Sequence, residues 1–169
     1  MGADLRLAAE ALQGYRPVGQ RMLPSRLGPW LLLQDCYNAN PRSTETALET
    51  LATLPGPRAA ILGSMLELGP TEADLHQRVG RKAGQLGIDL LIAVGPMAGH
   101  YAAGCSQSAT RAVQCASHAQ AALALQSEMA RGGTVLVKGS RGARMEQVVA
   151  SLASSFSAEP AASNAGGRH

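Results

Sequence analysis

The sequence lacks any apolar run long enough to cross a membrane. No stretch of its 169 residues approaches the roughly 18 to 20 consecutive apolar residues that a spanning helix needs. The amino terminus also lacks a basic segment followed by an apolar core, which would mark a secretory signal. We therefore expect a soluble, cytoplasmic protein without a membrane span.

Cysteine and lysine are scarce as well. The three cysteines, Cys36, Cys105 and Cys115, are odd in number and have no C-x-x-C spacing. This pattern argues against a disulfide framework or a zinc knuckle, so we expect reduced thiols and no metal site. Lys82 and Lys138 are the two lysines, and the net charge is only +3. Such a weak excess of positive charge does not indicate nucleic-acid binding.

Several nucleotide and catalytic motifs are missing. Neither lysine completes a phosphate-binding G-x-x-x-x-G-K-[ST], and G-x-G-x-x-G is absent. The chain therefore cannot hold nucleotide phosphates by those two devices. The nucleophile elbow G-x-S-x-G and H-E-x-x-H are missing too.

The sequence does contain a regular alternation of short apolar runs and amphipathic segments, in a length that suits one domain. This order predicts an α/β, Rossmann-like fold with a mostly parallel sheet and helices on both faces. The expected strands are 30–34, 58–62, 89–94, 111–115 and 134–137, and the expected helices are 44–54, with Ser43 as N-cap, 75–86, 97–103, 119–130 and 143–153. A first helix over 3–13 and a connector over 14–29 precede them, and residues 154–169 form a tail that we expect to be disordered.

Ligands of such sheets bind at the carboxyl ends of the strands, so the loops there are the candidate site. The loop 35–41 offers Asp35 for ribose hydroxyls and the amides of Asn38 and Asn40 for further polar contacts. An alternative fits the same residues. The two asparagines can hydrogen-bond their own backbone in a turn from which Pro41 starts a helix.

Two further loops carry charged residues. Lys138, Ser140 and Arg141 lie between the last strand and the last helix, where backbone amides and cations suit an anion, although charges that merely solvate a strand end remain the alternative. Glu67 can meet a cationic group or can be a solvated acid. We expect His76 to make a structural hydrogen bond and Cys36 to be an inert thiol, because no base lies beside it in the sequence.

Taken together, these segments resemble the C-terminal domain of Mur ligases. The resemblance covers about residues 8–152 and rests on the motifs DCYNANP at 35–41, LGSMLELG at 62–69, H-x-x-V-G at 76–80, GIDLLIAVG at 87–95 and VLVKGSRGARMEQVV at 135–149. Within the family, the segments are most similar to the type that joins D-alanyl-D-alanine to UDP-N-acetylmuramoyl-tripeptide. The resemblance divides the chain into a remnant of the central domain over 1–20, the C-terminal domain over 21–153 and the tail.

This resemblance implies ATP-dependent amide-bond formation through an acyl phosphate, with ATP and Mg²⁺ bound mainly by N-terminal and central domains that this sequence does not contain. Arg21, Asp35, Asn38 and Asn40 would contact ATP. Glu67, Lys138, Ser140 and Arg141 would face the dipeptide or the reacting centre. Gly19-Gln20-Arg21 departs from the G-R that the family usually has in the connector, and Ser64 replaces a common Asp. The alternatives are a non-catalytic α/β binding module and another ligase of the superfamily.

Overall fold

A computed structural model describes residues 22–157 of the chain. The expected first helix, the first half of the connector with Arg21, and residues 158–169 of the expected tail lie outside the described residues. Within them, no helix is both long and apolar enough to cross a membrane.

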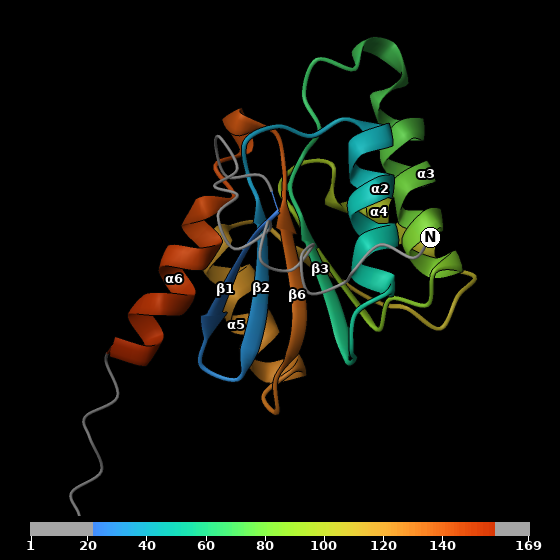
Figure 1. Cartoon of the computed structure of the whole chain (residues 1–169). Coiled ribbons are helices and arrows are strands. Elements are labelled where there is room, and N and C mark those ends of the chain that lie inside the picture. The colour runs from blue at the N-terminus through green and yellow to red at the C-terminus, as the bar shows by residue number, and fades with distance from the viewer. Residues whose placement is uncertain (1–21, 158–169) are drawn as a thin grey trace, which may run out of the picture.

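A six-stranded sheet forms the centre of the molecule, in the order β1-β2-β6-β3-β4-β5 (Figure 1). All neighbouring strands run parallel except β1, which pairs antiparallel with β2. The strands are β1 (Leu23–Leu27), β2 (Trp30–Asp35), β3 (Arg58–Leu62), β4 (Leu90–Val94), β5 (Arg111–Cys115) and β6 (Gly133–Lys138).

Helices cover both faces of this sheet, which confirms the predicted fold class. One face packs against α2 (Pro41–Ala52), α3 (Glu72–Gln85) and α4 (Ala98–Cys105), and the other against α5 (His118–Glu128) and α6 (Glu146–Ser157). Short 3₁₀ turns, Gly69–Thr71 and Arg141–Ala143, precede α3 and α6. Successive residues of a central strand contribute to opposite cores, as Ile61 and Leu62 do in β3. This explains why the strands read as continuous apolar runs.

The pair α3 and α4 packs unusually closely. A Cβ atom added at Gly80 would collide with the carbonyl oxygen of Tyr101, and one added at Gly104 would collide with that of Gln77. Glycine at these two positions therefore lets the helix backbones touch. The same two helices carry His76 and Tyr101, which hydrogen-bond the backbone of the loop after β3.

The structure differs from the sequence prediction at three places. The strand β1 lies in the segment that we expected to be a connector. The sequence did not indicate it because it is an exposed edge strand that contains Pro24 and has no apolar run. The N-cap of α2 is Asn40 rather than Ser43, which lies at the third position of a capping box. The last helix continues to Ser157, so residues 154–157 are helical rather than part of a disordered tail.

Candidate functional site

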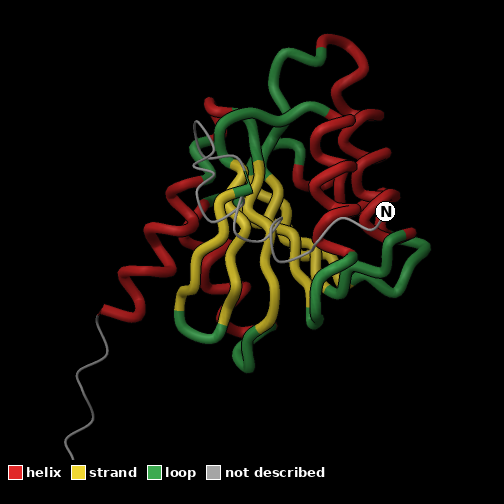
Figure 2. The backbone as a smooth tube through the Cα atoms, viewed as in Figure 1, coloured by secondary structure: helices red, strands yellow, loops and turns green. Residues whose placement is uncertain are grey.

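The carboxyl ends of β2, β6 and β3 lie side by side and bring three predicted loops together (Figure 2). In the sheet register, Lys138 at the end of β6 is paired with Asp35 on one side and with Leu62 on the other. The loops that follow Asp35, Leu62 and Lys138 therefore converge, although Asp35 and Lys138 are 103 positions apart in the sequence, because β6 is inserted between β2 and β3.

Lys138 points into the protein rather than out of it. Only 2% of the residue is exposed, and its Nζ donates to Asp35 Oδ2 at 2.6 Å and to the carbonyl oxygen of Asn38 at 2.9 Å. Asp35 is buried as well. The alternative that Lys138 merely solvates a strand end is wrong, because its ammonium group is buried and paired. That Lys138 faces an anion stays a prediction, and Lys138 is among the residues that line a pocket at this end of the sheet. Its charge is compensated by the carboxylate beside it.

Ser140 ties the three loops to one another. Its hydroxyl donates to the carbonyl oxygen of Ala39 at 3.2 Å and accepts from the amide of Leu66 at 2.9 Å, while its own amide donates to the carbonyl oxygen of Ser64 at 3.1 Å. The sequence had indicated that this amide could bind an anion. In the structure it is not available, because it donates to the carbonyl oxygen of Ser64 in the loop after β3. The Ser140 side chain acts as a clasp at the edge of the sheet.

The asparagines follow the turn that the alternative interpretation described. Asn38 Oδ1 accepts from the amide of Ala39 at 2.8 Å, and Asn40 Oδ1 accepts from the amide of Ser43 at 2.9 Å. Asn40 donates from its own amide to Ser43 Oγ at 3.2 Å, which completes the capping box of α2. Both side chains are exposed and still line a pocket, so the local role does not exclude contact with a ligand.

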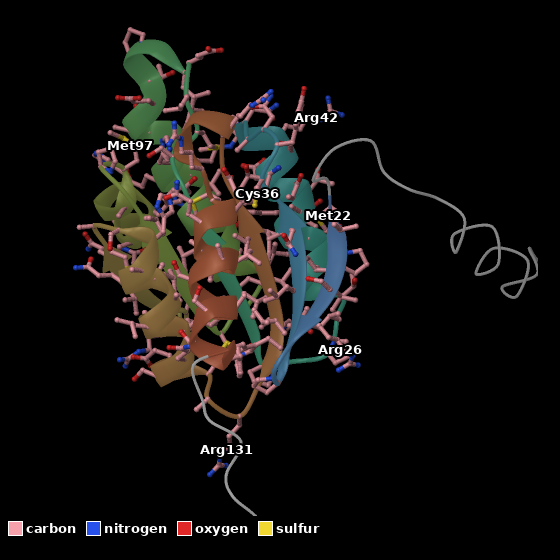
Figure 3. The ribbon with its side chains drawn as sticks, turned by 90° about the vertical axis from the view of Figure 1, so that its left-hand side faces the viewer. Met22, Arg26, Cys36, Arg42, Met97 and Arg131 are labelled. Atoms are coloured by element: carbon pink, nitrogen blue, oxygen red, sulfur yellow. The ribbon has the colours of Figure 1, made fainter. Side chains whose placement is uncertain are left out.

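That pocket has a volume of about 530 Å³ and opens between the end of β2 and the start of α2. Its lining combines a carboxylate, an ammonium group, a guanidinium group, amides and hydroxyls: Met22, Asp35, Asn38, Asn40, Arg42, Ser43, Thr46, Ala47, Thr50 and Lys138. Figure 3 shows Met22, Cys36 and Arg42 toward the same end of the molecule, with Arg26 and Arg131 toward the other. Such a lining suits a hydroxyl-rich, anionic ligand.

The other predicted residues lie on the rim of this edge. The guanidinium carbon of Arg141 is 6.0 Å from the centroid of the Tyr37 ring, a cation–π distance, and both residues are exposed. Glu67 is exposed too and has a left-handed backbone, with a φ of 63°. The side chain of Leu66, its neighbour, reaches Gly142 of the loop after β6.

His76 of α3 and Tyr101 of α4 hydrogen-bond the backbone of the loop after β3. His76 is fully buried, with Nε2 accepting from the amide of Met65 at 2.9 Å and Nδ1 2.6 Å from the carbonyl oxygen of Glu72. The Tyr101 hydroxyl donates to the carbonyl oxygen of Gly63 at 3.0 Å. The expected structural hydrogen bond of His76 is confirmed. Tyr101 had no signal in the sequence, because its partner lies 38 positions away.

Cys36 is inert, as expected. Its thiol is buried and donates to the carbonyl oxygen of Val137 at 3.6 Å. Burial, and then the negative charges of Glu146 and Asp35, raise the pKa of Cys36 to about 12. The thiol is consequently protonated at neutral pH and is no nucleophile. In residues 22–157, no three His, Cys, Asp or Glu side chains are grouped in a way that could hold a metal ion.

Comparison with known proteins gives a consistent result. A family model described as "Mur ligase, glutamate ligase domain" matches residues 20–141. The UDP-N-acetylmuramoyl-tripeptide–D-alanyl-D-alanine ligase of Escherichia coli is 36% identical over 155 residues, which are 90% of this chain and 33% of that protein. The enzyme of the same name from Bacillus subtilis is 28% identical over 86% of this chain and 33% of its own length.

Solved structures are similar as well. The crystal structure of MurF from Acinetobacter baumannii gives a TM-score of 0.77 at 28% identity, covering 90% of this chain and 34% of that one. MurF ligase from Thermotoga maritima in complex with ADP gives a TM-score of 0.73 over 90% of this chain and 36% of that one, and at 24% identity it supports the fold alone. The chain thus spans about a third of the length of the relatives it matches.

Proposed function

Because this chain belongs to the Mur ligase family, as a C-terminal domain, we propose that the protein containing it joins D-alanyl-D-alanine to UDP-N-acetylmuramoyl-tripeptide with hydrolysis of ATP. The observation that carries the proposal is the 36% identity over 155 residues to a ligase of that name. The convergence of the DCYNANP, GSMLELG and KGSR loops at one edge of the sheet supports it. A UDP-linked substrate and ATP also favour a cytoplasmic site of action.

We assign the nucleotide side of the reaction to the 530 Å³ pocket. Its residues fit a nucleotide, because a carboxylate can accept from ribose hydroxyls and a guanidinium group can pair with a phosphate. Asp35 keeps one carboxylate oxygen outside its pair with Lys138 for that purpose. Asn38 and Asn40 lie on the same wall, and Arg21 directly precedes Met22, which lines it. The phosphate loop and the ligands for Mg²⁺ must come from the preceding domains, because the motif is absent from this sequence.

The amine side of the reaction belongs to the rim. ATP supplies the phosphoryl group that activates the tripeptide carboxylate, and attack by the dipeptide amine then expels phosphate. Arg141 is exposed and cationic, which suits the carboxylate of D-alanyl-D-alanine, and Glu67 is exposed and anionic, which suits its ammonium group. Lys138 and Ser140 act indirectly, because their polar atoms are engaged in holding Asp35 and the three loops.

The test uses the whole ligase and the substitution Arg141→Ala. Loss of one charge-assisted hydrogen bond costs about 1.5 to 3 kcal/mol, so kcat/KM for D-alanyl-D-alanine should fall by about 10- to 100-fold. The matched control is Arg131→Ala, because Arg131 is also exposed but lies toward the opposite end of the sheet. Equal kinetics for the two variants would contradict the role of Arg141. Mass spectrometry of the product identifies the amine component, and incorporation of a single amino acid instead of the dipeptide would contradict the proposed substrate.

A further inference from the structure

The loop after β3 is held by four successive backbone contacts. The carbonyl of Gly63 accepts from Tyr101, that of Ser64 from the amide of Ser140, the amide of Met65 donates to His76, and that of Leu66 donates to Ser140 Oγ. Two of the partners come from the helix pair α3 and α4, and the other two come from Ser140. The residue that follows these contacts is Glu67, so their geometry determines where its carboxylate is presented.

His76 can serve as the partner of Met65 in only one tautomer. Its Nδ1 lies 2.6 Å from the carbonyl oxygen of Glu72 and must carry the proton, which leaves the lone pair of Nε2 for the amide of Met65. The Tyr101 ring packs edge-on against the imidazole, with centroids 4.9 Å apart and an interplanar angle of 78°. Neither nitrogen is free for chemistry, which excludes His76 as an acid or base that touches the substrates.

We propose that neutral His76 is a positioning residue of the ligase, which holds Met65 so that Glu67 is presented to the incoming amine. The part of this inference that concerns the amine rests on the proposed function, and the anchoring of Met65 does not. The left-handed backbone of Glu67 supports the assignment, because a non-glycine residue adopts this conformation only where its surroundings impose it.

Protonation of His76 would break the anchor. An imidazolium carries hydrogen on both nitrogens, so an N–H group would then face the N–H group of Met65. Glu72 of the same helix favours the charged form, while burial and the positive charge of His100 on α4 oppose it. Tyr101 also contacts the ring, and burial keeps its hydroxyl protonated by raising its pKa. Burial is the largest of these effects and lowers the pKa of His76 below the ordinary value of 6.5.

The stability that neutral His76 contributes depends on pH. Because the folded state binds a proton on His76 less readily than the unfolded state, the contribution of neutral His76 to stability is complete above pH 6.5. It is lost as the pH falls through 6.5 toward the lower pKa of the folded state. The loop should therefore open at acid pH before the sheet does.

The first experiment is amide hydrogen exchange by NMR on the 169-residue chain. At about pH 8 the Met65 amide should be protected, and its protection factor should fall at least about tenfold at about pH 5, while the amides of Ile61 and Ile92 keep theirs. In His76→Gln, where the side-chain oxygen can accept from Met65 but does not titrate, protection should not depend on pH. The control His100→Gln removes an exposed histidine of α4, so the pH dependence at Met65 should remain, and its midpoint should move only slightly upward because the repulsion from His100 is gone. Unchanged protection of Met65 in the wild-type chain at both pH values would overturn the inference, as would simultaneous loss at Met65 and Ile61.

The second experiment measures the whole ligase. His76→Leu should raise KM for D-alanyl-D-alanine by about tenfold and change kcat less, while His76→Gln should stay within about threefold of wild type and lose the acid limb of the pH profile. If His76→Leu does not fold, the pH profile of His76→Gln still decides the matter, because a wild-type acid limb in this variant would overturn the inference. A protein that does not use the dipeptide would refute the proposed function and leave the exchange result on Met65 standing.

Discussion

Lys138 and Asp35 form a buried ion pair across two neighbouring parallel strands, with 2.6 Å between Nζ and Oδ2. Lys138 is 2% exposed and Asp35 is 8% exposed. The pair joins the last residue of β2 to the last residue of β6, and the lysine also holds the carbonyl oxygen of Asn38. It therefore orients the first residues of one loop from the end of another strand, on the wall of the pocket assigned to the nucleotide.

The first prediction concerns this pair. Replacing Lys138 by Met leaves the Asp35 carboxylate buried without a partner, and we expect the free energy of unfolding to fall by about 3 to 5 kcal/mol. The double variant Asp35→Asn with Lys138→Met removes both charges and should recover most of that loss. Urea denaturation of the four proteins in the cycle measures the coupling. Equal losses in the single and the double variant would contradict the pairing.

A second prediction concerns the clasp. In Ser140→Ala, the amide of Leu66 and the carbonyl oxygen of Ala39 lose their hydroxyl partner, and the free energy of unfolding should fall by about 1 to 3 kcal/mol. Ser154→Ala is the matched control, because the exposed Ser154 hydroxyl only donates to the carbonyl oxygen of Ala150 in its own helix. We expect less than about 0.5 kcal/mol there. A comparable loss in the two variants, measured by urea denaturation, would show that Ser140 is not a clasp.

The third prediction separates the local role of Asn40 from any contact with a ligand. Asn40→Ala removes the N-cap of α2 and should lower the free energy of unfolding by about 0.5 to 2 kcal/mol. Asn40→Asp keeps a capping oxygen and adds a negative charge at the helix N-terminus, so its stability should equal or exceed that of the wild type. Thermal denaturation compares the three proteins. A less stable aspartate variant would contradict the capping assignment.

A fourth prediction follows from the buried thiols. The pKa of Cys36 is raised to about 12 and that of Cys105 to about 11, so at about pH 8 both are protonated and react with a thiol reagent only when the chain opens. All three cysteines should react at once in denaturant. The exposed control Ser106→Cys should add one rapidly labelled thiol to the folded chain. Rapid labelling of the wild type would contradict the burial.

The buried thiol of Cys36 should also make the folded domain less stable at alkaline pH. Because folding raises the pKa of Cys36 from 9.0 to about 12, its contribution to stability is present below pH 9 and is lost as the pH rises toward 12. Urea denaturation between about pH 8 and 11 measures this loss, which should be smaller in Cys36→Ala relative to that variant's own stability at about pH 8. A wild-type slope in Cys36→Ala would assign the alkaline loss to other groups.

The sequence was sufficient for the fold class because buried parallel strands are continuous apolar runs, and for the location of the site because the topology places loops at the carboxyl ends. It was insufficient for the burial of Lys138. A lysine in a loop motif looks solvated unless its carboxylate partner, 103 positions away, is known. The contacts of Ser140 have the same character, because its three partners lie 74 to 101 positions from it. Local patterns also missed β1, because an edge strand need not be buried on both faces and so need not be a continuous apolar run.

The position of β6 between β2 and β3 has a consequence for synthesis on the ribosome. A nascent chain that ends before Gly133 contains β2 and β3 but not the strand that both of them pair with. Asp35 then has no lysine partner. The loop after β3 lacks Ser140, whose hydroxyl accepts from the amide of Leu66 and whose amide donates to the carbonyl oxygen of Ser64. The sheet of this domain can form completely only after β6 has left the exit tunnel. Until then the backbone groups of β2 and β3 that pair with β6 remain unpaired.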